Sequence, residues 1–176
     1  MRTLPIAALS IALLVLSRPA AAQQQPAAPA PPPQPTCTAA EYRQLDFWVG
    51  EWSVTVGGGP AGTSRVTSEE SGCVVHEHWT GARGGTGQSF NFYNRQTGKW
   101  RQVWVASNGS SLDFSGTLVD GSLAYTGETK APNGGRVLHK LTFTPNADGT
   151  VRQFWETSAD EGATWKVSFD GRYTRK

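Results

Sequence analysis

Most of the motifs that reveal an enzyme's chemistry are missing from this sequence. No G-x-S-x-G nucleophile, P-loop or C-x-x-C pair occurs among its 176 residues, which include two cysteines and three histidines. The triple glycine at 57–59 is followed by Pro60 and is typical of a hairpin loop. The sequence therefore gives no support to a serine hydrolase, a P-loop protein or a thiol redox enzyme.

An apolar run long enough to cross a bilayer as a helix is also missing. The stretch from Leu4 to Leu16 has only the length of a signal-peptide core, about a dozen residues. It follows a basic Arg2 and precedes the small residues at 20–22, an arrangement that predicts a secretory signal peptide over residues 1–22. We therefore expect a periplasmic or secreted protein with no membrane insertion after this segment is removed.

The sequence has little excess charge of either sign. It contains 16 basic and 14 acidic residues, and the loss of Arg2 and Arg18 with the signal peptide leaves 14 of each. A neutral chain lacks the electrostatic footprint of a protein that binds nucleic acid or an anionic membrane. We therefore expect no nucleic-acid partner, and the composition does not suit a DNA-binding protein or a cytosolic enzyme.

Proline and the aromatic residues divide the remaining chain into a linker and one domain. Eight of the 11 prolines precede Cys37, and residues 23–36 form a Pro/Gln/Ala-rich segment that is typical of a disordered tether. All seven Trp, all seven Phe and all four Tyr follow it. The folding unit is therefore expected to be a single domain over residues 37–176.

The domain shows a helical pattern only at its start. A capping box at Thr38 and Glu41 predicts one short helix over residues 39–46. Alternating runs rich in Val, Thr and aromatic residues follow, separated by turn residues. They predict ten strands, over residues 47–56, 63–70, 73–80, 86–93, 99–106, 111–118, 122–129, 136–144, 150–157 and 164–173.

The short connections between these strands favour antiparallel pairing, because parallel pairing needs a long crossover. Ten sequential strands must either leave two exposed edges or close on themselves. We therefore expect an all-β fold, a single antiparallel up-and-down β-barrel of about ten strands with one short N-terminal helix. A barrel of this size can hold one small ligand.

The tripeptide Gly50-Glu51-Trp52, on the first strand just after a short helix, resembles the G-x-W motif of the calycins, the superfamily of lipocalins and their relatives. In that superfamily the Trp packs across the closed end of the barrel, under a basic residue near the end of the last strand. The resemblance implies a calycin-like barrel in which Trp52 is buried and Arg172 lies near its ring.

Longer segments resemble an exported bacterial family known as domain of unknown function 1579. They cover almost all of residues 45–176 and read LDFWVGEWSV, GCVVHEHW, FNFYNRQTGKWRQVWV, VRQFWETSADEGATW and FDGRYTRK. This resemblance implies the fold and export and brings no settled function. A further resemblance is to nitrobindin, a haem-binding barrel whose ligand is a His close to the C-terminus. No His follows His139 here, so we expect no haem and no other cofactor.

The only two cysteines, Cys37 and Cys73, are an even number in a chain that is expected to be exported, which favours a disulfide over two free thiols. The bridge would tie the start of the helix to the third strand. In the loop-entropy model, a closed loop of about 36 residues contributes on the order of 3–4 kcal/mol.

Two histidines, His76 and His78, share one face of the third strand, because side chains alternate along a strand. An H-x-H pair is half of a common zinc site. At least one further protein ligand is needed, for which four residues qualify: His139, Glu51, Glu156 and Asp113. None of them lies at a diagnostic spacing. We therefore favour polar groups of the surface or the cavity rim over a metal site, and we place His76 and His78 with the ligand-binding residues, near the rim or wall of the cavity.

Two near-repeats, RQVW at 101–104 and RQFW at 152–155, lie on the fifth and ninth strands, with Gln and Trp on one face and Arg on the other. We expect the Gln and Trp faces to point inward, since outward Trp would expose large apolar area. The predicted lining is Gln102, Trp104, Gln153 and Trp155. Such a lining suits a ligand with a flat or apolar body and a few polar groups. The alternative is a barrel that its own core fills.

Residues 158–165, SADEGATW, match the Asp-box pattern S-x-D-x-G-x-T-W, which is known from sialidases and other carbohydrate-active proteins. In a structural interpretation, Asp160 caps turn amides, Gly162 adopts a left-handed conformation and Trp165 packs under the turn. A propeller would need several copies, so the single copy favours this interpretation over a sugar site.

Three functions are compatible with the sequence. The favoured one is an exported barrel that holds a small apolar or aromatic molecule in its lumen without catalysis. The first alternative is a metal-assisted or acid–base enzyme that uses His76 and His78 in the same barrel. The second is a structural or interaction module. The sequence leaves the oligomeric state open.

Overall fold

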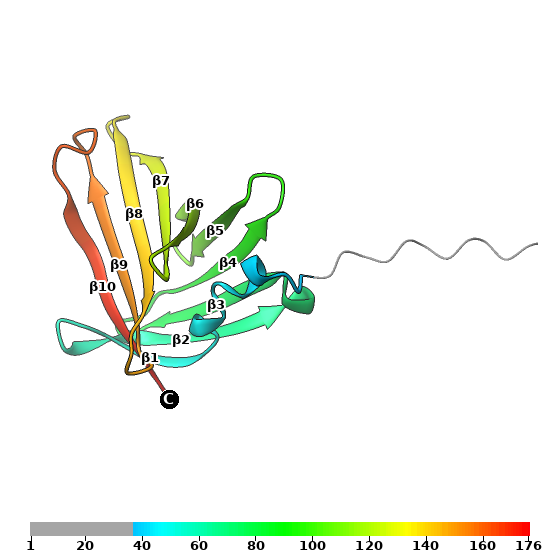
Figure 1. Cartoon of the computed structure of the whole chain (residues 1–176). Helices are drawn as coiled ribbons and strands as arrows, with labels where there is room; N and C mark the ends of the chain where they lie inside the picture. Colours follow the sequence, from blue (N-terminus) through cyan, green and yellow to red (C-terminus); the bar gives the residue numbers. More distant parts are fainter. Residues whose placement is uncertain (1–36) are drawn as a thin grey trace, which may run out of the picture. The chain divides into compact units, whose positions relative to one another are not determined.

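Alternating apolar residues and tight turns fold the chain into ten antiparallel strands, each paired with the next one in the sequence (Figure 1). The computed structural model describes residues 37–176; the predicted signal peptide (1–22) and linker (23–36) lie outside the described residues. The strands are β1 (Gly50–Val56), β2 (Gly59–Glu69), β3 (Val74–Gly81), β4 (Thr86–Asn94), β5 (Lys99–Ala106), β6 (Ser111–Val119), β7 (Ser122–Lys130), β8 (Arg136–Pro145), β9 (Val151–Ser158) and β10 (Lys166–Arg175).

The last strand pairs with the first, so the sheet closes into a barrel and leaves no open edge. In this closing ladder, Trp52 lies opposite Arg175 and Val54 lies opposite Tyr173. The predicted fold, an all-β up-and-down barrel of ten strands after one short helical region, is confirmed. Apart from β2, the strands begin and end within about three residues of their predicted bounds.

The turn between β6 and β7 shows how the sequence sets the hairpins. It consists of Asp120, with a φ of 47°, and Gly121, with a φ of 76°. A D-G pair with positive φ at both positions gives a two-residue turn whose twist matches that of the flanking strands. The chain therefore reverses directly into the neighbouring antiparallel strand.

A helical region precedes the barrel, and it consists of two 3-10 turns rather than one α-helix. η1 (Ala40–Arg43) and η2 (Asp46–Trp48) lie close to the predicted position. The N-cap of η1 is Ala39 rather than the expected Thr38, and it makes no side-chain capping bond. Packing determines the position of this region instead, because Leu45 is fully buried in the core. Among the described residues, no helix is both long and apolar enough to cross a membrane.

Large aromatic side chains close the end of the barrel that this helical region covers. The Trp48 ring lies 4.5 Å from the ring of Phe143 and 6.1 Å from that of Tyr173. Trp52 is fully buried, as predicted, and its indole N–H donates to the Trp48 carbonyl oxygen at 2.9 Å. The rings therefore pack against one another and form the buried core of this end.

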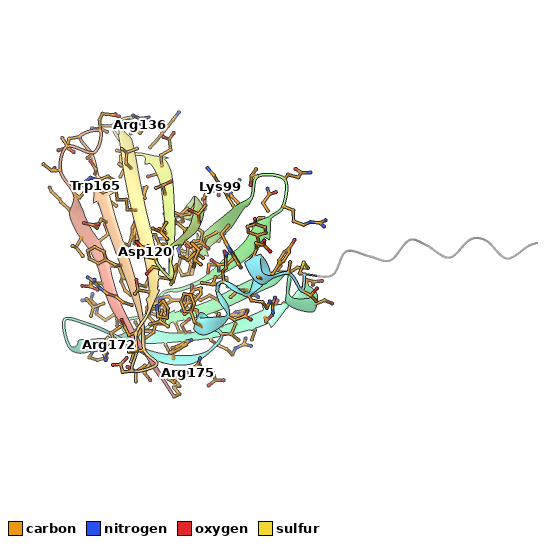
Figure 2. All side chains as sticks on the ribbon, in the orientation of Figure 1. Lys99, Asp120, Arg136, Trp165, Arg172 and Arg175 are labelled. Atoms are coloured by element: carbon orange, nitrogen blue, oxygen red, sulfur yellow. A yellow bond between two sulfur atoms is a disulfide. The ribbon has the colours of Figure 1, made fainter. Side chains whose placement is uncertain are left out.

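The basic residue over Trp52 is Arg175 and not the predicted Arg172. The Arg175 guanidinium lies 4.4 Å from the Trp52 ring. Arg172 lies on the outer face of β10 and pairs with Asp148. Figure 2 shows both arginines near the C-terminal end of this strand. The prediction is wrong because Arg172 alternates with Tyr173, which faces inward, so its side chain must face outward.

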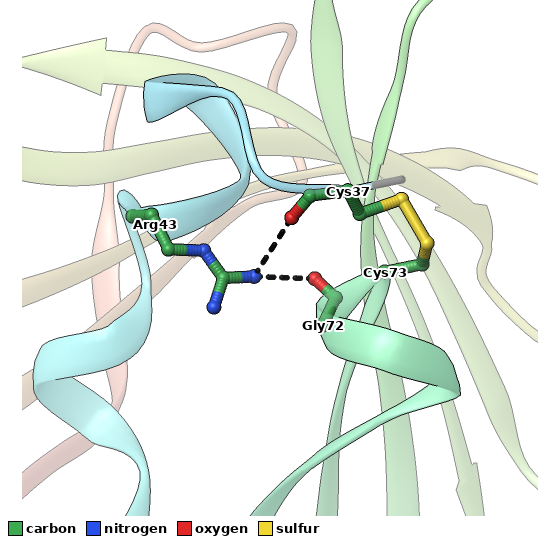
Figure 3. The surroundings of a disulfide bond; sticks show 4 residues. All are labelled: Cys37, Arg43, Gly72 and Cys73. Carbon is green, nitrogen blue, oxygen red and sulfur yellow. Dashed lines mark hydrogen bonds between the residues drawn. A yellow bond between two sulfur atoms is a disulfide. The ribbon is translucent and has the colours of Figure 1, made fainter. Parts of the chain in front are cut away.

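The predicted disulfide between Cys37 and Cys73 is present (Figure 3). The two Cα atoms are 5.0 Å apart, and the bridge ties the chain just before η1 to the start of β3. The Arg43 guanidinium donates to the carbonyl oxygens of Cys37, at 3.3 Å, and Gly72. The helical region is thus fastened to the barrel by one covalent bond and by these hydrogen bonds beside it.

Loss of the disulfide is expected to destabilise the protein. Replacing both Cys37 and Cys73 with Ser should lower the free energy of unfolding by about 3–4 kcal/mol, because the unfolded chain regains the freedom of a long loop. Guanidinium unfolding measures the change. The reduced wild type is the matched control and should unfold at the same midpoint as the double variant. A loss smaller than about 1 kcal/mol would contradict the expectation.

The two arginines of β10 are expected to differ in their effect on stability. Arg175→Ala removes the cation–π contact with the ring and a hydrogen bond to the Val49 carbonyl oxygen at 3.1 Å. It should cost about 1 kcal/mol of unfolding free energy. Arg172→Ala removes only an exposed ion pair and should cost less than about 0.5 kcal/mol. Urea unfolding of both variants tests the difference, and equal losses would contradict it.

Candidate ligand-binding cavity

The end of the barrel opposite the helical region holds a cavity of about 210 Å³. β3, β5 and β9 run in the same direction as β1, away from the covered end, and the cavity residues Trp79, Trp104 and Trp155 lie in the later parts of these strands. The polar part of the lining consists of Glu77, Gln102, Gln153 and Tyr173. The apolar part consists of Trp79, Trp104, Leu112, Phe114, Leu141, Trp155 and Phe169.

The cavity receives all four side chains of the two near-repeats: Gln102, Trp104, Gln153 and Trp155. The alternating arginines lie on the outer faces of their strands, where Arg101 pairs with Asp113 and Arg152 with Asp170. Both Trp rings face inward and are nevertheless only half-buried. Their remaining exposed surface therefore belongs to the cavity.

Glycines on the inner wall explain why the large rings do not fill the lumen. Three cavity rings lie against a glycine of the wall: Trp79 against Gly62, Trp104 against Gly87 and Phe169 against Gly171. A Cβ atom on Gly87 would lie 2.3 Å from the Trp104 ring, well inside van der Waals contact. The missing side chains thus let the rings lie back along the wall and keep the centre open.

The structure corrects the predicted position of His76 and His78, which do not line the cavity. The inner face of β3 carries Val75, Glu77 and Trp79, so the two imidazoles lie on the outer face. Val75 and Trp79 together have more apolar area to bury than two imidazoles, and this fixes the register of the strand.

On the outer face, the His76 ring stacks on Phe90 at 4.2 Å and lies 4.2 Å from the His78 ring. Its Nδ1 lies 3.2 Å from the carboxylate oxygens of Glu69, and its Nε2 lies 2.9 Å from Gln88 Oε1. Both ring nitrogens of His76 are therefore engaged. In the part of the chain that the structure describes, no three His, Cys, Asp or Glu side chains are grouped closely enough to hold a metal.

The residue that sequence reasoning missed is Glu77, between the two histidines. Its side chain is buried at the cavity, where Ser64 Oγ donates to Oε1 at 2.8 Å and Ser89 Oγ donates to Oε2 at 3.0 Å. Burial raises the pKa of this carboxyl from its ordinary 4.5 to about 7. The signal was available in the sequence, since Glu77 alternates in phase with Val75 and Trp79.

A hydrogen-bonded network extends from Glu77 across the wall of the barrel. Ser89 Oγ accepts from Asn91 Nδ2 at 3.0 Å, and Asn91 Oδ1 accepts from Gln102 Nε2 at 2.8 Å. These side chains are all buried, and a buried polar group without a hydrogen-bond partner would destabilise the fold. The network orients both Glu77 and Gln102 before any ligand enters.

The third histidine, His139, faces the barrel interior next to Trp155. The Trp155 indole N–H donates to His139 Nδ1 at 3.1 Å, and Nε2 lies 2.8 Å from Thr129 Oγ1. Because an indole nitrogen is a donor only, Nδ1 carries a lone pair and the ring proton lies on Nε2. Burial also lowers the pKa of His139. The neutral imidazole therefore holds the Trp155 indole in place.

The Asp box forms the hairpin between β9 and β10 and does not line the cavity. Asp160 accepts from the backbone N–H of Thr164 at 2.9 Å, and Ser158 Oγ accepts from that of Gly162 at 2.8 Å. Hydrogen bonds from the Thr164 hydroxyl, the Ser158 hydroxyl and the Thr164 backbone N–H lower the pKa of Asp160 to about 2. Trp165 donates to the Gly162 carbonyl oxygen at 3.1 Å. These hydrogen bonds all lie within the hairpin, so the motif stabilises the turn.

Comparison with known proteins does not place the chain in a family. No protein-family model matches it. A segment of 46 residues is 46% identical to part of a sucrose-6-phosphate hydrolase from Klebsiella pneumoniae. This segment makes up 26% of the chain and 9% of the hydrolase, so the similarity covers too little of either protein to assign the activity of one to the other.

Stability is expected to depend on pH through Glu77. Its pKa is about 7 in the folded protein and returns to the ordinary 4.5 on unfolding, so the folded state binds the proton more tightly. The contribution of Glu77 to the free energy of unfolding is therefore highest below pH 4.5, falls as the pH rises from 4.5 through about 7, and is constant above that. Relative to the always neutral Glu77→Gln variant, the wild type should lose about 3 kcal/mol across this range.

Urea unfolding of the wild type and Glu77→Gln between about pH 4.5 and 8 measures this difference. The exposed Glu41 offers a matched control, because Glu41→Gln makes the same chemical change outside the barrel. Glu41→Gln keeps Glu77 in place and should therefore retain the loss of stability that Glu77 causes as the pH rises. A gap between wild type and Glu77→Gln that is constant with pH would contradict the role given to this carboxyl.

Proposed function

We propose that the barrel binds a small apolar or aromatic molecule in its open end and performs no catalysis. The observation that carries the proposal is the cavity itself, whose inward-facing rings of Trp79, Trp104 and Trp155 are only half-buried. Small soluble domains bury such rings in their core or use them for binding. The glycines that hold the rings against the wall favour the second reading, because a barrel built only for stability would fill its lumen.

The size and chemistry of the cavity define the kind of ligand. A volume of about 210 Å³ is below the range of about 300–1,000 Å³ that drug-sized ligands occupy, so a molecule of one or two rings fits it. Indole faces suit a flat ring, which packs well at centroid distances of about 4.5–7 Å. The side chains of Gln102 and Gln153 add amide groups that can fix the ligand's orientation.

We further propose that the protein is exported, and that it is related to the calycins and to the family known as domain of unknown function 1579. The disulfide between Cys37 and Cys73 supports an oxidising compartment, where such bridges form and persist. The buried Trp52 under a guanidinium, at the end of the barrel that a helical region covers, supports the calycin relationship.

Binding of a neutral probe tests the proposal. We expect 2-phenylethanol to bind with a dissociation constant at or below about 1 mM, and to shift the indole N–H resonances of Trp79, Trp104 and Trp155 in NMR spectra. Trp104→Ala and Trp155→Ala should each weaken binding by about tenfold, because each removes a ring face from the cavity.

Trp165 provides the control for these variants, because it lies in the β9–β10 hairpin and does not line the cavity. Trp165→Ala should leave the dissociation constant unchanged. If no aromatic probe binds at several millimolar, whatever its charge, or if binding survives loss of both cavity Trp rings, the ligand-binding function is refuted.

A further inference from the structure

The cavity contains an acidic side chain and, within residues 37–176, no basic side chain to balance its charge. Among the lining side chains of the described barrel, Glu77 is the single carboxyl, and no Arg, Lys or His accompanies it. Its direct partners are the hydroxyls of Ser64, Ser89 and Tyr173, which hydrogen-bond the carboxylate without neutralising it. A buried carboxylate with no counter-charge is costly, and the cost is removed by a proton or by a cation.

Three carboxylates on the outside of the barrel, in contrast, each have an arginine as partner. Asp113 pairs with Arg101, Asp170 with Arg152 and Asp148 with Arg172. These pairs are exposed to water, where a carboxylate has least need of a partner. Glu77 is buried and therefore needs a counter-ion more than these exposed carboxylates do, yet no basic side chain of the described barrel lines its cavity.

Aromatic faces supply the second half of a cation site. Trp79 follows Glu77 at the next inward position of β3, and Trp104, Trp155 and Phe169 line the same cavity. The face of an aromatic ring attracts a cation, and Trp does so most strongly. An anionic ligand would meet the carboxylate of Glu77 with no positive group in the lining to offset the repulsion.

We propose that the cavity binds an organic ammonium ion, a primary or quaternary amine on a flat or apolar body of one or two rings. Its positive charge pairs with the Glu77 carboxylate, and its body lies against the Trp faces. This inference rests on the proposed ligand-binding function and names the ligand class of that same cavity.

The rival arrangement uses the same carboxyl in its protonated form, as a donor to a neutral acceptor such as a carbonyl group. Binding of a cation requires the deprotonated form, so the two arrangements respond to pH in opposite directions. Burial raises the pKa of Glu77 to about 7 in the empty barrel. The titratable groups beside it are Tyr173, from β10, and His76, on the outer face of its own strand.

Calorimetric titration with three probes tests the ligand class. 2-Phenylethylammonium and 2-phenylethanol have the same body and differ in charge, and benzyltrimethylammonium keeps its charge at every pH. At about pH 8 we expect the primary amine to bind at least tenfold more tightly than the alcohol. Binding of benzyltrimethylammonium should strengthen by up to about tenfold per pH unit below pH 7 and level off above it.

Glu77→Gln should abolish the preference for the cation and the pH dependence while 2-phenylethanol still binds, which also shows that the variant is folded. Glu41→Gln is the matched control and should bind all three probes as the wild type does. Should Glu77→Gln not fold, the pH dependence of benzyltrimethylammonium binding to the wild type decides alone.

Two results would overturn the inference, and they differ. If the alcohol binds as tightly as the amine, or if binding of the permanent cation does not strengthen as the pH rises, the ammonium assignment fails and the ligand-binding function stands. If none of the three probes binds at several millimolar, both fail together.

Discussion

Closure of the barrel by pairing of β1 with β10 is the constraint on which the rest of the structure depends. With Trp52 opposite Arg175, side-chain alternation decides which residues of these two strands face inward, and the neighbouring ladders extend the alternation around the barrel. The same rule brings Tyr173 against the helical region at one end and places Glu77 in the cavity of the other. A shift of any strand by one residue would exchange the two faces of that strand, so the core and the cavity depend on the register of every ladder.

The two ends of the interior use aromatic rings in different ways. At the covered end, Trp48, Trp52 and Tyr173 pack against one another and exclude solvent. At the open end, the rings pack against backbone glycines and keep part of their surface free. Between the two lies the polar network that joins Glu77 to Gln102, in which hydroxyl and amide partners offset the cost of burial. The packed core and the cavity therefore occupy different parts of one barrel.

The sequence was sufficient for the fold, because alternation and turn residues act locally. It also predicted the inward position of Gln102 and Trp155 from the arginines that alternate with them. The prediction was wrong where the side-chain alternation along a strand was not taken into account. His76 and His78, considered as half of a zinc site, were expected at the rim or wall of the cavity, although Val75 and Trp79 set the opposite phase. The predicted helix is instead two 3-10 turns, because packing of a short segment outweighs its local propensity for an α-helix.

The pairing of a ring with a glycine on the facing wall has an evolutionary consequence. A side chain at Gly87 cannot be accommodated unless the indole of Trp104 is replaced by something smaller, since the added atom would lie 2.3 Å from that ring. The glycine and the ring of each such pair therefore constrain each other and are not free to change independently. Among relatives, the identity of the wall residue should covary with the size of its ring, and lumens of different widths can arise without any change in the number of strands.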